Sequence, residues 1–536
     1  YNDRTKFTLE LLDRLHKFAR FETAHFVVKY DAEHDPGLGE YVASYLEPIY
    51  EAVTSDFETP LTDKTIIEIF PTQRAFGVRI TGKPWIHTVG ASTGRIIALA
   101  SPRESVDLMG RYNLARVLKH EFTHTVTLAA TDNRIPHWFT EGLAVHQEDA
   151  PRPFDWSELL ADAVRRDRLF TLESIDWGFI RPRRPTDRQM AYAQSEWMVE
   201  YIVERFEYDM IQRMVNRFRG GQTQSQVFGE LLNVEPGQFN RDFHDWARGQ
   251  VRRWNCRFDL TPPEDLKELR ALAAKEDAAA SVLGRLARAE FDESDYERSM
   301  AAARRALTLD ENDGNGLEVL TSVLTLLSQE ERSESGKRDY EDEALPLLER
   351  LIRIAPNSWA GTKHFAEIAL RRKEWDRAAA ALQRLQHLCP ADPASWRGLA
   401  GIYLERGEEE LALPQLLELA RIEQNDPSVP QKVATIVRRR GDLREARYWF
   451  RQALSIDPSS VELHEASGDV SMQIGDTEAA LREYKTLTEL QPTNVKYFEA
   501  AALAAHKLGD AQQAESFARQ AVKLDPTSQV RTLVGN

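Results

Sequence analysis

The sequence predicts two folds in one chain: an α+β domain over residues 1–260, with a small sheet and a helical half, and an all-α solenoid over residues 265–536. Three observations support this prediction. Short apolar segments occur near the N-terminus, longer helical patterns follow from about residue 111, and the second half repeats every 34 residues. The Pro262-Pro263 pair lies where the pattern changes, so a hinge is expected there.

The first half contains short runs of β-branched and aromatic residues, followed by segments in which apolar residues recur every three to four positions. The runs predict strands and the longer segments predict helices. The expected strands cover residues 25–30, 65–70 and 95–100. The expected helices cover residues 5–17, 38–55, 111–130, 137–149, 189–206, 207–219, 223–233 and 236–254.

The period of the second half is set by glycine, alanine and proline at fixed positions. Loop glycines stand 34 residues apart at Gly407, Gly441, Gly475 and Gly509, and small residues from Ala378 to Ala514 keep the same spacing. The pattern resembles the tetratricopeptide repeat (TPR), in which each unit is a pair of antiparallel helices. About six to seven repeats fit this half of the chain, with an exposed loop insertion expected near 328–342.

A single repeat of this kind cannot bury its apolar face alone. Neighbouring copies are therefore expected to stack into a solenoid with a concave face. The resemblance implies that this concave face binds a protein partner.

Composition excludes some partners and leaves the compartment open. The formal net charge is −16, and an acidic chain repels phosphate backbones, so nucleic acid is not expected as a partner. No apolar run approaches the roughly 18 residues of a membrane span. The chain starts at Tyr1 rather than Met, which is compatible with export after removal of a signal segment. Cys256 and Cys389 lie far apart and in different predicted domains, so we expect neither a disulfide nor a cysteine-based metal site.

A metal-binding motif lies on the helix expected over 111–130. His120-Glu121-Phe122-Thr123-His124 matches the pattern H-E-x-x-H. Residues four apart lie on one face of a helix, so His120 and His124 can bind the same ion. Glu121 points to one side of that pair, where it can reach a water molecule bound to the metal.

A third ligand is expected on the next helix, which begins after Pro136. Glu141 lies on that helix, 17 residues after His124, and the intervening chain is long enough to turn and bring a carboxylate back. Two histidines and one carboxylate form a catalytic zinc site, in which the fourth position stays open for water. The sequence therefore predicts Zn²⁺ as the cofactor, with Glu121 as the general base.

The H-E-x-x-H motif followed by Trp138-Phe-Thr-Glu-Gly-Leu-Ala144 resembles the gluzincin clan of zinc metallopeptidases, in particular bacterial peptidase MA-like domains. The resemblance covers about residues 20–255. It implies a zincin-like fold, a peptide or protein substrate, and Glu141 as the third zinc ligand. Thermolysin-type relatives carry an aspartate four residues after the third ligand. Val145 stands there in this chain, so another residue must orient at least one of the histidines.

The resemblance also indicates residues that contact the substrate. Tyr192 stands where aminopeptidase N relatives place a tyrosine that donates to the oxyanion, although it can equally serve only to pack its helix. The segment 89–94 corresponds to the substrate-binding edge strand, so Gly90 and Ala91 are expected to pair with a peptide backbone. Aminopeptidases of the clan carry a glutamate in this strand, and this sequence has none. An endopeptidase is therefore favoured over an aminopeptidase.

These observations predict a zinc-dependent peptidase with repeats that recruit a protein. Two alternatives remain open at this stage. The chain can be a non-catalytic TPR scaffold whose zinc domain binds peptides, or a zinc hydrolase that acts on a bond other than a peptide bond.

Overall fold

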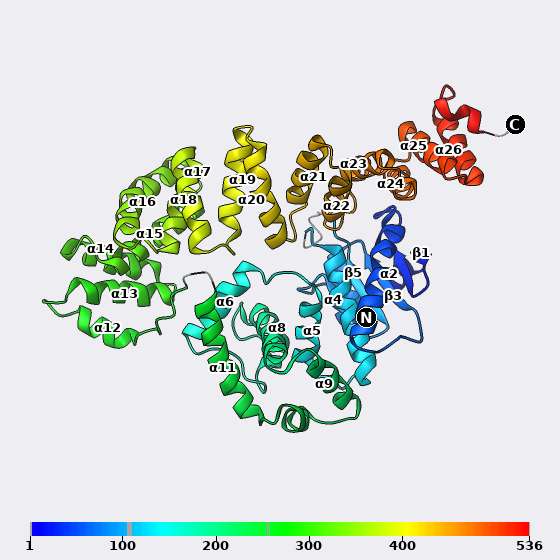
Figure 1. Cartoon of the computed structure of the whole chain (residues 1–536). Coiled ribbons are helices and arrows are strands. Elements are labelled where there is room, and N and C mark those ends of the chain that lie inside the picture. The colour runs from blue at the N-terminus through cyan, green and yellow to red at the C-terminus, as the bar shows by residue number, and fades with distance from the viewer. Residues whose placement is uncertain (1–2, 104–109, 255, 257, 535–536) are drawn as a thin grey trace. The chain divides into compact units, whose positions relative to one another are not determined.

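The computed structural model describes residues 3–103, 110–254, 256 and 258–534 (Figure 1). Contacts divide the chain into two compact units, which are described separately below. Unit 1 comprises residues 1–151, 172–240 and 423–536, and unit 2 comprises residues 152–171 and 241–422. Each unit thus combines segments from both halves of the sequence, so the contacts do not follow a single boundary near residues 260–265.

The sheet of unit 1 has five strands in the order β1-β2-β3-β5-β4. The three central strands β2, β3 and β5 run parallel, whereas β1 and β4 pair antiparallel at the two edges. The expected strands at 25–30, 65–70 and 95–100 are confirmed as the central three. The charged edge strand β1 was not expected from the sequence. The strand bounds are β1 (Ala19–Glu22), β2 (Phe26–Tyr30), β3 (Thr65–Phe70), β4 (Gly90–Ser92) and β5 (Ile96–Ala100).

Helix α4 (Leu114–Thr131) packs on the sheet at β4 and β5 and also contacts α2 and α5 (Figure 1). The Phe122 ring of α4 meets Phe26 of β2 edge to face at 5.2 Å between centroids, and both side chains are fully buried. This apolar face holds α4 against the sheet and leaves its other faces to α5 and to the functional residues. Helix α5 (His137–Gln147) packs in turn on α8 (Asp187–Phe206).

The remaining helices of the first half agree with the expected ones within a few residues, except that α3, α6 and α7 were not expected. Helix α6 belongs to unit 2, and α11 crosses the boundary between the units. Their bounds are α1 (Asp3–Leu15), α2 (Leu38–Asp56), α3 (Gln73–Thr81), α6 (Phe154–Arg165), α7 (Ile175–Ile180), α9 (Asp209–Arg219), α10 (Gln224–Val227), the π-helix η1 (Phe228–Leu232) and α11 (Pro236–Arg253).

The second half forms consecutive helix pairs, as the 34-residue period predicts. The four loop glycines from Gly407 to Gly509 have φ values of 71°, 89°, 82° and 80°, a left-handed conformation that glycine adopts without strain. The crossing alanines from Ala378 to Ala514 are buried. Helices α12–α20 lie in unit 2 and α21–α26 in unit 1.

After the single helix α12, the described residues form pairs from α13 with α14 to α25 with α26, followed by a 3₁₀ turn. The bounds are α12 (Leu266–Ala273), α13 (Ala280–Asp292), α14 (Tyr296–Leu309), α15 (Gly314–Glu330), α16 (Glu334–Ile354), α17 (Trp359–Arg371), α18 (Trp375–Leu388), α19 (Pro393–Glu405), α20 (Glu409–Ile422), α21 (Ser428–Arg440), α22 (Leu443–Leu454), α23 (Val461–Gln473), α24 (Thr477–Leu490), α25 (Val495–Lys507), α26 (Ala511–Leu524) and η2 (Gln529–Leu533).

The expected loop insertion near 328–342 is wrong. Helix α15 continues to Glu330 and α16 already begins at Glu334, capped by the Ser333 side chain. Glu341 is buried, and its charge is balanced by ion pairs with Arg371 at 2.8 Å and Arg372 at 2.9 Å. The charged composition therefore reflects a lengthened helix with paired charges rather than an irregular loop.

The expectation that the two cysteines stay unpaired is also wrong. Cys256 and Cys389 form a disulfide across a sequence separation of 133 residues. The segment after α11 belongs to unit 2, as does the end of α18. The two cysteines therefore share a unit, although the sequence assigned them to different domains.

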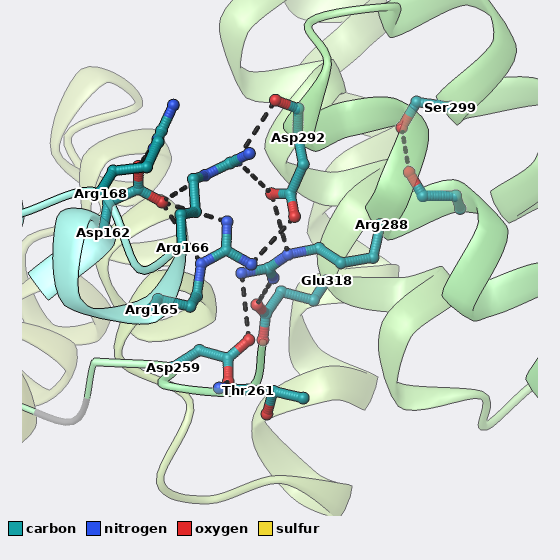
Figure 2. A network of polar contacts seen from close by, with 11 residues as sticks. Asp162, Arg165, Arg166, Arg168, Asp259, Thr261, Arg288, Asp292, Ser299 and Glu318 are labelled. Atoms are coloured by element: carbon teal, nitrogen blue, oxygen red, sulfur yellow. Dashed lines mark hydrogen bonds and ion pairs between the residues drawn. The ribbon is translucent and has the colours of Figure 1, made fainter. Parts of the chain in front are cut away.

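Helix α6 is attached to the first repeats by a partly buried network of charges around Asp292 (Figure 2). Arg165 of α6 pairs with Asp292 of α13 at 2.9 Å, and its side chain is 6% exposed. Arg288 extends the network from Asp292 to Glu318 of α15. Removing one member of such a network leaves a buried charge without its partner, which is strongly destabilising. The network explains why residues 152–171 group with the repeats.

Every helix in the described part of the chain is too short or too polar to span a membrane.

Candidate metal centre

Three side chains expected as metal ligands come together between α4 and α5. His120 and His124 occupy consecutive turns of α4, and their Nε2 atoms lie 3.2 Å apart. The Glu141 Oε2 atom of α5 lies 3.3 Å from Nε2 of His124 and 3.6 Å from Nε2 of His120. The three side chains are only 10–14% exposed. The helix spacing and the returning carboxylate therefore form one compact cluster.

The outer nitrogen of each imidazole is engaged by a neighbouring side chain. His120 Nδ1 lies 2.7 Å from Glu148 Oε1, and a carboxylate only accepts, so this nitrogen donates. His124 Nδ1 lies 2.9 Å from the Thr140 hydroxyl. Thr127 donates to the Thr123 carbonyl at 2.9 Å, so Thr140 donates to Thr127 at 2.8 Å and accepts from His124. In the neutral form of each imidazole, the Nε2 atom therefore presents a lone pair to the cluster.

The donor set fits a divalent cation. Two Nε2 lone pairs and one carboxylate oxygen converge, and Glu141 Oε2 is buried without a hydrogen-bond partner among the described residues. Converging lone pairs repel each other unless a cation lies between them. Two histidines and one carboxylate with no fourth side chain are the ligands of catalytic zinc.

Electrostatics also favour the charged carboxylate. Without a metal ion, burial alone would raise the pKa of Glu141, but His124, His120 and His137 in their protonated forms outweigh it and hold this pKa well below its usual value. His137 Nε2 contacts Glu141 Oε1 at 3.1 Å, although the His137 side chain itself is 44% exposed. The second carboxylate oxygen is thus held by His137, which directs Oε2 toward the two imidazoles.

The sequence did not identify Glu148, which orients His120. Burial would raise the pKa of Glu148, but its contacts with His120 and Arg116 lower it, so the group remains a carboxylate. Glu148 caps the end of α5, seven residues after Glu141 and therefore on the same helix face. Val145 occupies the thermolysin-type position, and the carboxylate that contacts His120 stands three residues later. The spacing of two full turns could have revealed it.

Replacing Glu148 with Gln is expected to weaken zinc binding by about 10- to 100-fold, because the amide no longer supports the His120 imidazole with a negative charge. The measurement is the zinc dissociation constant from competition with a chelator. The matched control is Asp149→Asn, because the Asp149 side chain is 81% exposed and contacts no ligand in the described chain. Equal dissociation constants for Glu148→Gln and wild type would contradict this role.

The proposed base Glu121 lies beside the edge strand. It is buried, and a Cβ atom added to Gly90 of β4 would lie 2.6 Å from its Oε1 atom. Burial raises the pKa of Glu121, against the opposing effect of the His120 and His124 imidazoles. A cation in the cluster would lower this pKa again. Glu121 thus follows the ligand His120 on α4 and lies against Gly90 of β4.

Tyr192 of α8 lies near the same carboxylates. Burial raises its pKa, and the charges of Glu141 and Glu121 add to the rise, so the phenol keeps its proton. Phe179 of α7 contacts the Tyr192 ring edge to face at 4.9 Å and the His137 ring at 4.7 Å. This geometry is compatible with both interpretations of Tyr192, as a hydrogen-bond donor and as a packing residue.

Comparison with known proteins places family matches on both halves of the chain. Residues 80–249 match the family model of the Peptidase MA superfamily. Residues 337–393, 365–430 and 466–528 match a tetratricopeptide repeat. The chain combines a Peptidase MA superfamily domain with tetratricopeptide repeats. The first match includes Gly90, Glu121, Glu141 and Tyr192, so the candidate site lies within the Peptidase MA domain.

No curated protein matches this chain. Among solved structures, similar chains include the TPR protein YrrB, with 15% identity, a TM-score of 0.28, and coverage of 34% of this chain and 95% of that one. PilF of Pseudomonas aeruginosa has 16% identity, a TM-score of 0.26, and coverage of 40% and 97%. The C-terminal part of a TPR protein from Cytophaga hutchinsonii has 16% identity, a TM-score of 0.29, and coverage of 47% and 100%.

Proposed function

We propose that the chain is a zinc-dependent endopeptidase whose repeats recruit a protein substrate or partner. The observation that supports this most is the convergence of His120, His124 and Glu141 lone pairs next to the buried carboxylate of Glu121. The Peptidase MA match supports the reaction class, and the TPR match supports protein or peptide partners.

In this proposal His120, His124 and Glu141 hold the zinc ion. The ion, when bound, polarises the scissile carbonyl and lowers the pKa of the attacking water. Glu121 takes the proton of this water and transfers it to the leaving amine. Tyr192 donates a hydrogen bond to the oxyanion that develops on the carbonyl.

The edge strand β4 supplies a backbone for pairing with an extended peptide. Val89 accepts from Ala100 and Thr93 donates to Ile96, so the alternating ladder directs the N–H and C=O groups of Ala91 toward β5. The outward groups then belong to Gly90 and Ser92, and not to Ala91 as the sequence suggested. The outward carbonyl of Gly90 already accepts from the Thr88 hydroxyl at 3.0 Å. A substrate strand paired there would pass directly beside Glu121, which lies against Gly90.

An endopeptidase fits this strand better than an aminopeptidase. The strand segment 89–94 contains no carboxylate that could hold a free N-terminal amine. Cleavage within a chain leaves no charged N-terminus to be matched at this strand. We therefore expect cleavage within a chain rather than at its N-terminus.

Gly90→Ala is expected to lower kcat by about 10-fold or more with one zinc ion still bound. The new Cβ would lie 2.6 Å from Glu121 Oε1 and 3.0 Å from a Leu99 methyl, so the Glu121 carboxylate must move. Misplacing a reacting group by about 1 Å is enough for losses of this order. Gly249→Ala is the control, because a Cβ there meets no atom within 4 Å. Unchanged kcat in Gly90→Ala would disprove the position assigned to Glu121.

The direct test of the function is digestion of a mixed peptide library by the zinc-loaded full chain, with free and N-acetylated members of each sequence. We expect internal cleavage of both forms, loss of cleavage on chelation, and recovery on adding zinc. Zinc binding without cleavage of any peptide would overturn the proposal in favour of a peptide-binding scaffold or a hydrolase of another bond. Cleavage limited to free N-termini would overturn the endopeptidase part alone.

A further inference from the structure

The first turn of the metal-binding helix α4 is held by groups from the last repeats, within unit 1. The Leu114 N–H group donates to the Ser455 carbonyl at 2.7 Å, and the Asn113 N–H group donates to Asn425 Oδ1 at 3.1 Å. Arg111 pairs with Asp457 at 3.1 Å. The N–H groups at the start of a helix have no partner inside the helix. Residues of the repeats therefore supply part of the N-terminal cap of α4.

The contact of Leu114 with Ser455 is shielded from water, because Leu114 is fully buried and Ser455 is 3% exposed. Asn113 and Asp457 are also buried, at 9% and 8% exposed, whereas their partners Asn425 and Arg111 lie at the surface. Asn113 also caps α4 from within, since its Oδ1 atom accepts from the Arg116 N–H group at 3.1 Å. The N–H groups of Leu114 and Asn113 are buried and need acceptors, and water cannot easily replace the buried Ser455 carbonyl, so losing these acceptors would displace the helix start.

The first turn of α4 is linked to the metal ligand His120. Arg116 lies in this first turn and pairs with Glu148, which in turn holds His120 Nδ1. His120 follows Arg116 by one helical turn on the same face. A shift of the helix start would therefore move both His120 and the carboxylate that orients it.

A second set of contacts joins the same repeats to α2, which packs on α4. The Tyr41 ring meets the buried His464 ring edge to face at 5.3 Å, and Lys485 forms an ion pair with Glu40. At the start of α2, a Cβ added to Gly37 would lie 2.8 Å from a Thr486 methyl, so α2 and α24 pack closely there. The repeats therefore support α4 both directly and through α2.

We propose that the repeats over residues 423–536 position the metal-binding helix, so that the affinity of the site for zinc depends on them. These repeats would then stabilise the metal centre, in addition to binding a protein partner. This inference rests on the zinc site of the proposed function, but it does not depend on peptide hydrolysis.

The test compares zinc dissociation constants of full-length variants by chelator competition, together with the visible absorption of the cobalt-substituted proteins. Asn425→Ala removes the acceptor for Asn113, and Asp457→Asn removes the charge that faces Arg111. We expect each variant to bind zinc about 10-fold more weakly, at the lower end of the range for groups that orient metal ligands. We also expect an altered cobalt spectrum.

Two controls separate positioning from general stability. Asn425→Asp keeps an acceptor oxygen at this position, so its zinc affinity should equal that of the wild type. Asn494→Ala removes the cap of α25 in the same group of repeats, without a contact to α4, and should leave zinc affinity unchanged. If Asn425→Ala does not fold, Asp457→Asn carries the test alone.

The possible outcomes are distinct. Wild-type zinc affinity and cobalt spectra in folded Asn425→Ala or Asp457→Asn would overturn the inference and leave the proposed function intact. Weakened zinc binding in these variants, in a chain that cleaves no peptide, would support the inference and overturn the proposed function. A wild-type chain that binds no zinc would overturn both.

Discussion

Glu121→Gln is expected to bind one zinc ion with near wild-type affinity and to lose about 10²- to 10⁴-fold in kcat for peptide hydrolysis. Glutamine has the shape of glutamate, so it fits the buried position beside Gly90. Its amide cannot take a proton from water at neutral pH. The ligand cluster of His120, His124 and Glu141 is complete without residue 121, so the metal should stay.

The measurement combines kcat with the zinc content of the same preparation. Glu148→Gln provides a useful contrast, because it should weaken zinc binding and recover much of its activity when zinc is added in excess. Full activity in Glu121→Gln would show that another group acts as the base. Loss of zinc from Glu121→Gln would show that Glu121 is a ligand instead.

Glu141→Gln is expected to abolish both stoichiometric zinc binding and peptide hydrolysis. A neutral amide is a poor replacement for an anionic zinc ligand, and the two remaining imidazoles do not complete a catalytic site. Zinc that binds only the folded state stabilises it, by about 2.7 kcal/mol when free zinc is 100 times Kd. The wild type should therefore show a higher Tm with zinc, and Glu141→Gln should show the same Tm with and without it.

His34→Ala is the control for this experiment. Asp31, Glu33 and His34 are a second group whose potential ligand atoms lie within 4.8 Å of one another, but Glu33 and His34 are exposed. If His34→Ala lost the zinc-dependent rise in Tm and Glu141→Gln kept it, zinc would bind at Asp31, Glu33 and His34 instead of at the proposed site.

The ligand cluster could be predicted because its geometry is local. A spacing of four residues places His120 and His124 on one helix face, and a short connection brings Glu141 back. The three parallel strands and the repeat helices were predicted for the same reason, since each follows from a period within one segment. Strand β1 is a four-residue edge strand with two charged residues and no buried residue, so it contains no apolar run that would predict a strand.

Features that join distant segments could not be predicted from these patterns. The Cys256–Cys389 disulfide depends on the segment after α11 belonging to unit 2, which no local pattern indicates. The contact between Asn113 and Asn425 joins residues more than 300 positions apart and leaves no periodic signal. Glu148 is different, because its spacing of two helical turns from Glu141 is a local pattern that places both carboxylates on one helix face.

X-ray absorption at the zinc edge of the zinc-loaded full chain tests the central claim most directly. Our account predicts one zinc ion per chain, bound by two imidazole nitrogens at about 2.0–2.1 Å and by oxygen ligands at about 2.0–2.2 Å from Glu141 and water. Sulfur at about 2.3 Å, four protein ligands, or a spectrum unchanged in Glu141→Gln would contradict it.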